Sequence, residues 1–104
     1  MKKRIAFKMF LKPGFESEYE RRHREIWPEL VELLRKSGVS NYSIHFDKSS
    51  NQLFAFQEQD PEKEYDISTE PVMRKWWEYM ADIMLTNKDH SPIVVQLDEI
   101  FFMA

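Results

Sequence analysis

The sequence predicts an α+β fold in which one antiparallel sheet is covered on one face by helices. Segments with alternating apolar residues and segments with helical periodicity follow the order strand, helix, two strands, helix, strand. This order is the ferredoxin-like βαββαβ pattern, in which both helices pack on the same side of the sheet. The chain has 104 residues, which is enough for one compact domain over residues 1–104.

The first strand is expected at residues 3–11, where apolar side chains alternate and a Pro-Gly pair follows. A helix is expected from about residue 15 to 37, and Gly38 suits the position just after its C-terminal end. Pro28 is anomalous inside this helix, because it cannot donate the usual hydrogen bond and its ring clashes with the preceding turn. We therefore expect a kink near residues 24–28.

The middle of the chain has the pattern of a β-hairpin followed by a second helix. The hairpin strands are expected at residues 39–47 and 52–59, joined by a short polar loop. Helical character is expected again from Pro61, with a firmer helix over residues 72–84. A final strand is expected at about residues 93–102 and completes the sheet.

Because helices cover only one face of the predicted sheet, the other face should expose apolar residues. It is expected to include residues such as Phe7 or Phe10 and part of the C-terminal segment Ile100-Phe101-Phe102. Exposed apolar area of this extent usually marks an interface. We therefore expect a homodimer that packs sheet on sheet or extends the sheet edges.

A histidine in the middle of an aromatic stripe is the first candidate for chemistry. Tyr19, His23 and Trp27 are four residues apart, so each step turns only about 40° around the helix and all three share one face. An imidazole with its ordinary pKa of about 6.5 can donate or accept a proton near neutrality. His23 is thus either a buried structural group or a proton-transfer group, and periodicity alone favours the structural role.

A pair of tryptophans on the second helix favours the active-site alternative. Trp76 and Trp77 lie about 100° apart around the helix axis, so one can fill the core while the other lines a cavity. Flat indole faces suit the apolar C–H faces of sugars. A pocket of Trp, Tyr and one His fits a neutral polar substrate and a gentle reaction such as the opening of a sugar hemiacetal, to which acid–base catalysis contributes roughly 10²–10⁴-fold.

Composition excludes several classes of function. The net charge of −3 argues against a nucleic-acid binder, and no stretch approaches the roughly 18 apolar residues of a membrane span. Without cysteine and with two glycines, the chain has no thiolate chemistry and no glycine-rich nucleotide loop. His45 and Asp47 could be two metal ligands, but no third is apparent, and Asp89-His90-Ser91 is most simply a polar loop. We expect a cytoplasmic protein without metal or cofactor.

Several short segments, taken in order, have a more specific pattern. They are RRHREIWPEL at 21–30, NYSI at 41–44, LFA at 53–55, WWEYM at 76–80, and Asn87 with Ser91-Pro92. Together they resemble the L-rhamnose mutarotase family over nearly the whole chain. The first and fourth segments in this order are specific, although neither is sufficient alone.

The resemblance implies a dimeric α+β barrel built from the βαββαβ unit. It implies an isomerase of rhamnose metabolism that interconverts the α and β anomers of L-rhamnose without metal or organic cofactor. By position, His23 corresponds to the proton donor of the family, and Tyr19, Tyr42, Trp76 and Trp77 correspond to its sugar-binding residues. In this mechanism His23 as imidazolium protonates the ring oxygen, while the second proton-transfer group stays open between a water, Tyr19 and His23 itself.

Two other functions stay open at this point. Dimeric α+β barrels also include small monooxygenases, some of them haem-degrading, whose sites use Trp, His and Asn, and the fold alone does not separate these activities. The other alternative is a non-catalytic sugar-binding dimer in which His23 merely orients the ligand.

Overall fold

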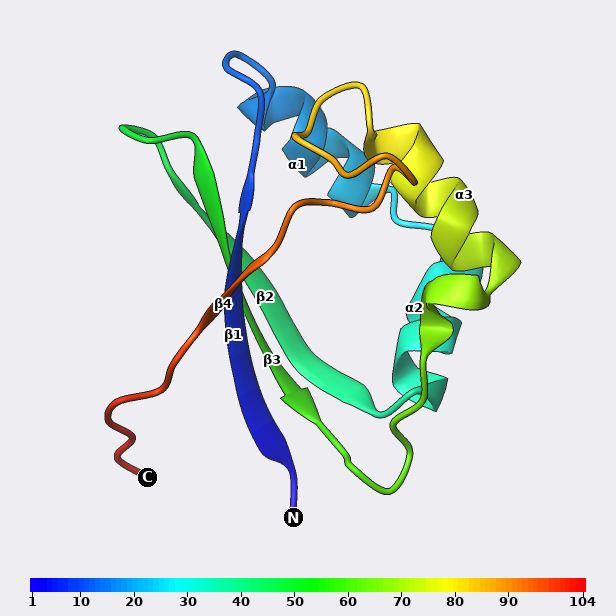
Figure 1. Cartoon of the computed structure of the whole chain (residues 1–104), viewed down its shortest axis with the longest axis vertical. Helices are drawn as coiled ribbons and strands as arrows, with labels where there is room; N and C mark the ends of the chain where they lie inside the picture. The colour runs from blue at the N-terminus through cyan, green and yellow to red at the C-terminus, as the bar shows by residue number, and fades with distance from the viewer.

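A computed structural model describes residues 1–104 and arranges them as a twisted sheet with helices on one side (Figure 1). The strands are β1 (Lys3–Phe10), β2 (Val39–Asp47), β3 (Gln52–Gln59) and β4 (Val95–Leu97). They lie in the order β2-β3-β1-β4, and every neighbouring pair is antiparallel. The predicted ferredoxin-like βαββαβ class is therefore confirmed.

Three α-helices cover the sheet. They are α1 (Glu16–Arg24), α2 (Pro28–Lys36) and α3 (Pro71–Met80), and the short 3-10 helix η1 (Ile67–Thr69) precedes α3. Figure 1 shows all three α-helices on the same side of the sheet, while the C-terminal tail leaves toward the opposite side. None of them has the length and apolar character that a membrane span requires.

The long helix predicted over residues 15–37 is divided into two. Trp27 has an extended backbone with φ −64° and ψ 128°, as sterics favour for a residue before proline. Pro28 then takes the first position of α2, where its missing N–H costs no helical hydrogen bond. The prediction of one helix was wrong, although the break falls within residues 24–28, where the kink was expected. As a result α1 is a short helix of its own.

The second helical region also differs from the prediction. No helix begins at Pro61; turns lead instead to η1, whose first residues are capped by the Asp66 carboxylate. The helix predicted over 72–84 ends at Met80, because the chain turns there and buries Ile83 and Met84 against the sheet. These two residues reach the core from a turn and not from the helix.

The final strand is shorter than predicted. The prediction covered residues 93–102, whereas β4 contains only Val95–Leu97 and pairs with Ala6–Lys8 of β1. Beyond Leu97 the chain moves away from β1 and has no neighbouring strand within a single copy. An ion pair between Arg4 and Glu99 and the contact of the Arg4 guanidinium with the Phe102 ring, at 3.5 Å from its centroid, attach this tail to the sheet.

The core lies between the inner face of the sheet and the helices. Its buried members come from β1, β3, the three α-helices and the turn after α3: Met9, Leu11, Tyr19, Leu30, Leu53, Ala55, Trp76, Met80, Ile83 and Met84. Of the residues named for the open face, Phe7 packs against this core, whereas Phe10 alternates to the outer face. Phe56 and Phe102 are 45% and 52% exposed, so an apolar outer face is present as predicted.

Candidate active site

His23 lies on the inner side of α1 between two aromatic rings. Its imidazole stacks on Tyr19 with ring centroids 4.2 Å apart and planes at 29°. Its other neighbour is the Trp76 indole, which it meets edge to face at 5.4 Å and 89°. The four-residue spacing of Tyr19 and His23 thus produces a direct ring contact, and the second helix supplies the opposite wall.

The hydrogen bond of the His23 ring defines which nitrogen is free for chemistry. Nδ1 lies 3.0 Å from the Tyr19 carbonyl oxygen, which can only accept, so Nδ1 holds the hydrogen and donates it. Nε2 has no protein partner, and no buried polar side-chain atom in the structure lacks one. Nε2 must therefore reach accessible space, and its lone pair can take up a proton there.

The surroundings of His23 favour its neutral form. Burial lowers the pKa of His23 below its ordinary value of 6.5, and the hydrogen bond to the Tyr19 carbonyl offsets this only in part. The resting group near neutral pH is then an imidazole rather than the imidazolium assumed in the mechanism above. A neutral ring with Nε2 free is suited to accept a proton first and to donate it afterwards.

Two phenols border the imidazole, and both stay protonated at neutral pH. Burial raises the pKa of Tyr19 strongly, and the nearby Tyr42 phenol adds to the rise. Burial also raises the pKa of Tyr42 to about 12, although 39% of the residue surface remains exposed. Both hydroxyls can donate hydrogen bonds, but Tyr19 is a poor source of a proton.

An irregularity in β2 presents Tyr42 toward this region. The register between β2 and β3 shifts between Ser40 and Ser43, and Asn41 adopts a left-handed conformation with φ 48°. Two residues of β2, Asn41 and Tyr42, therefore stand opposite one residue of β3, which is the pattern of a β-bulge. Bulges commonly redirect a side chain next to a functional site. The sequence pattern predicted a strand here but not this bulge.

The two tryptophans differ in burial, as expected if one fills the core and the other lines a cavity. Trp76 is 7% exposed and belongs to the core, whereas Trp77 is half-buried. Two adjoining cavities meet at these rings, one of about 580 Å³ beside α1, α2 and β2, and one of about 80 Å³ beside α3. All five residues named for catalysis or sugar binding line the smaller cavity: Tyr19, His23, Tyr42, Trp76 and Trp77. All of them except Trp77 also line the larger one.

Sequence reasoning missed the rest of the smaller cavity. Its apolar wall consists of four methionines, Met9, Met73, Met80 and Met84. Thr86, His90 and Pro92 close another side. The helical arc of α3 could have indicated Met73 and Met80. Pro92 belongs to the segments quoted for the resemblance, whereas Asp89-His90-Ser91 was expected to be only a polar loop. The turn after α3 returns His90 to the cavity from a distance in the chain.

Of the other candidate groups, His90 lines the smaller cavity and His45 borders the larger one, whereas Asp47 lines neither. The Asp47 carboxylate accepts hydrogen bonds from Ser49 and Ser50 in the β2–β3 turn. The His45 ring lies edge-on to Phe56 at 5.7 Å, on the outer face of the sheet. No group of three or more His, Cys, Asp or Glu residues is close enough to hold a metal ion.

Comparison with known proteins gives a consistent result. A family model described as L-rhamnose mutarotase matches residues 4–103. The L-rhamnose mutarotase of Bacteroides thetaiotaomicron is 56% identical over 102 residues, which cover 97% of this chain and 98% of that protein. That of Phocaeicola vulgatus is 55% identical, with the same coverage. The crystal structure of an L-rhamnose mutarotase from Formosa agariphila superposes with a TM-score of 0.92 at 45% identity, covering 98% of this chain and 99% of that one.

Proposed function

The chain belongs to the L-rhamnose mutarotase family, and we propose that it interconverts the α and β anomers of L-rhamnose in the cavity that contains His23. The observation that carries this proposal is the state of His23, whose ring is neutral, held at Nδ1 and open at Nε2. Aromatic rings and phenols surround that open nitrogen. A group of this kind suits reversible proton transfer to a neutral sugar.

In the proposed reaction, one nitrogen moves one proton between two oxygens of the sugar. Nε2 of His23 accepts the proton of the anomeric hydroxyl while the bond between C1 and the ring oxygen breaks. The electrons of the O–H bond form the aldehyde C=O, and the electrons of the broken bond remain on the former ring oxygen, which receives the proton back from the imidazolium. Rotation about C1–C2 and the reverse sequence give the other anomer and neutral His23.

This route needs no second ionising residue. Both oxygens are bonded to C1 in the cyclic sugar, so the same nitrogen can reach them in turn. Tyr19 and Tyr42, protonated at neutral pH, would hold the sugar by donating hydrogen bonds. The raised pKa of Tyr19 disfavours it as the acid. In this proposal His23 acts twice, and a water is not required as the second proton-transfer group.

The aromatic and methionine walls account for the choice of a 6-deoxy sugar in this proposal. An indole of Trp76 or Trp77 would cover the apolar face of the pyranose. The buried methionines of the cavity offer thioether sulfur, which is only a weak hydrogen-bond acceptor. A methyl group at C6 gives up no hydrogen bond against such a wall, whereas a hydroxymethyl group would leave its hydroxyl without a hydrogen-bond partner.

We also propose a homodimer of one-domain chains that acts in the cytoplasm. The outer sheet face and the tail supply the apolar surface for the pairing, since Ile100, Phe101 and Phe102 are 96%, 78% and 52% exposed in the single chain. Pairing through this face would leave the helical side, which contains the cavity, free for substrate.

The direct test is NMR exchange between the two anomeric protons of L-rhamnose with and without the protein. We expect the protein to accelerate exchange for L-rhamnose and to act less on fucose and glucose. Broadened sugar signals without faster exchange would indicate the non-catalytic sugar-binding dimer. A Soret shift on addition of haem, together with unchanged exchange, would indicate a haem-dependent monooxygenase instead.

A further inference from the structure

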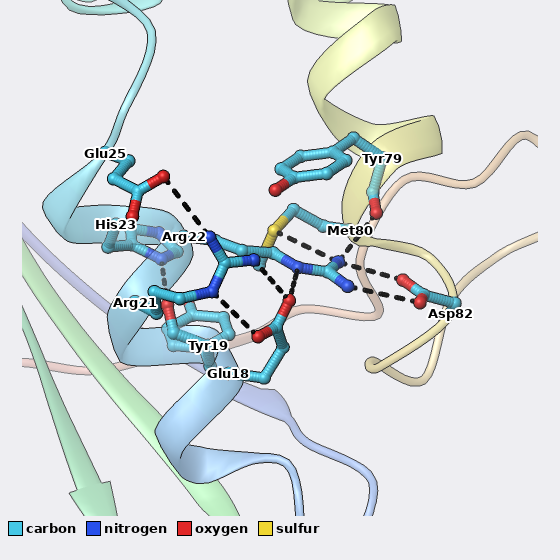
Figure 2. A network of polar contacts seen from close by, with 9 residues as sticks. All are labelled: Glu18, Tyr19, Arg21, Arg22, His23, Glu25, Tyr79, Met80 and Asp82. Atoms are coloured by element: carbon cyan, nitrogen blue, oxygen red, sulfur yellow. Dashed lines mark hydrogen bonds and ion pairs between the residues drawn. The ribbon is translucent and has the colours of Figure 1, made fainter.

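We propose that Arg22 is a positioning residue for this reaction: it fixes α1 against the C-terminal end of α3 and thereby holds His23 in contact with Trp76. The inference deepens the proposed function and rests on it. Arg22 precedes His23 in the chain, and Figure 2 shows its side chain reaching from α1 toward Asp82 and the C-terminal end of α3. Arg22 lines neither cavity.

The side chain of Arg22 is buried, and all three of its nitrogens donate hydrogen bonds. Nη1 donates to the Tyr79 carbonyl oxygen at 2.8 Å, and Nη1 and Nη2 bind the two carboxylate oxygens of Asp82 at 2.9 and 3.2 Å. Nε donates to Glu18 at 2.7 Å, one turn earlier on α1. Only 9% of the Arg22 side chain is exposed, against 65% for Asp82, so the guanidinium is shielded from solvent while its carboxylate partner is not.

Few other polar groups define the position of α1. The helix is separated from α2 by the extended Trp27, and its N-terminal end has no side-chain cap. Among the ion pairs made from α1, only the pair between Arg22 and Asp82 reaches another part of the fold. Arg21 pairs with Glu18 and Glu25, and Arg24 pairs with Glu20, all within residues 16–25. Arg22 is therefore the residue of α1 whose ion pair connects the helix to the end of α3.

The guanidinium also contacts the ring cluster behind His23. It lies 4.5 Å from the centroid of the Tyr79 ring. That ring is 5.6 Å from Trp27 and 5.6 Å from Trp76. Trp76 in turn meets the imidazole. Arg22 is thus connected to His23 through the backbone of α1 and through two aromatic contacts.

Arginine has properties here that lysine lacks. Its planar fork binds the Asp82 carboxylate with two parallel hydrogen bonds and still reaches the Tyr79 carbonyl. That carbonyl belongs to the last turn of α3, where the helix dipole favours a positive charge. A lysine ammonium could make one of these contacts at a time and would not stack on the ring.

The test compares Arg22→Met, Arg22→Lys and Arg24→Met in the full chain, using L-rhamnose exchange to obtain kcat and KM. Arg24→Met is the matched control, because Arg24 lies on the same helix and its only pair, with Glu20 at 3.6 Å, is exposed. We expect kcat of Arg22→Met to fall about 10- to 100-fold, the loss that follows a shift of about 1 Å at a reacting group. KM should change less, because three of the four proposed sugar-binding residues, Tyr42, Trp76 and Trp77, lie outside α1. Arg22→Lys should recover part of the loss, and Arg24→Met should match wild type.

The ring signals of His23 in NMR give a readout that does not depend on turnover. We expect them to shift in Arg22→Met and to stay unchanged in Arg24→Met. If Arg22→Met fails to fold, Asp82→Asn replaces it, because the Asp82 side chain is 65% exposed and the change preserves its shape. A folded Arg22→Met or Asp82→Asn variant with wild-type kcat, KM and His23 signals overturns the inference. Absence of exchange in the wild-type protein would instead refute the proposed function, and the His23 signals would still decide the positioning role.

Discussion

The imidazole of His23 meets the indole of Trp76 edge to face, with ring centroids 5.4 Å apart and planes at 89°. This contact joins α1 to α3, and both rings line the two cavities. Aromatic contacts of this kind contribute about 0.5–1.5 kcal/mol beyond the area they bury. The position of His23 and its proton-transfer chemistry therefore depend on the same contact, and separate variants are needed to test each.

Replacement of His23 by glutamine should abolish most of the activity while preserving the fold. The glutamine amide can donate a hydrogen bond to the Tyr19 carbonyl, but it cannot exchange a proton. We expect kcat for L-rhamnose exchange to fall roughly 10²–10⁴-fold. His45→Gln is the matched control, because His45 lies on the outer sheet face. Wild-type kcat in folded His23→Gln would leave His23 with a structural role only.

Activity should rise with pH through a midpoint below 6.5 and then level off. Burial lowers the pKa of His23 from 6.5, so the neutral form that accepts the first proton predominates above that midpoint. A rate that falls as pH rises through the same range would indicate that imidazolium is the active form. The measurement is kcat from anomer exchange across pH 5 to 8, the range in which histidine titrates.

The lowered pKa of His23 should also make the stability of the fold depend on pH. The unfolded chain takes up the His23 proton at about pH 6.5, whereas the folded chain takes it up only at lower pH. The contribution of neutral His23 to stability is therefore present above pH 6.5 and is lost as pH falls through the folded pKa. Denaturant unfolding of wild type and His23→Gln at several pH values should differ in this window.

Substitution of Trp76 should mainly affect stability, whereas substitution of Trp77 should mainly affect substrate binding. Trp76 is 7% exposed within the core, so Trp76→Ala should lower the free energy of unfolding by about 3–5 kcal/mol. Trp77 is half-buried and lines only the smaller cavity, so Trp77→Ala should destabilise less and raise KM more. Denaturant titration and anomer exchange on both variants give the comparison. Equal losses of stability would contradict the division between core and cavity wall.

Gly38→Ala should destabilise the fold more than Gly14→Ala. Both glycines have positive φ, 93° and 86°, which costs other residues roughly 1–2 kcal/mol. At Gly38 an added Cβ would also lie 2.7 Å from Gln59 Nε2 and 2.8 Å from the Asp60 carbonyl oxygen, whereas nothing lies within 4 Å at Gly14. The difference in unfolding free energy between the two variants measures the steric effect, and equal values would mean that Gln59 moves freely.

The proposed homodimer should depend on the outer face of the sheet. Phe56 is 45% exposed there and stands opposite Ala6 of β1. We expect Phe56→Glu to shift the protein toward monomer in sedimentation experiments, because a charge would replace apolar surface at the interface. Lys75→Glu, on an exposed position of α3, should leave the assembly unchanged. A dimer that tolerates Phe56→Glu would place the interface elsewhere.

Most of the fold could be predicted because its signals are local. Alternation defined β2 and β3 with the bounds that the structure has, and helical periodicity placed Tyr19 and His23 on one face. The errors occurred where local preference competes with packing. The chain leaves α3 at Met80 to bury Ile83, and β4 ends once β1 no longer lies beside it.

By itself, the sequence determined the α+β class, the inward face of each element and the residue types available for proton transfer. Tertiary structure alone decided the state of those residues. Burial lowers the pKa of His23, a bulge presents Tyr42, and Arg22 finds its carboxylate sixty positions away at Asp82. The physical reason is range: periodicity depends on neighbours within a few residues, whereas desolvation and ion pairing depend on groups that meet only after the chain has folded.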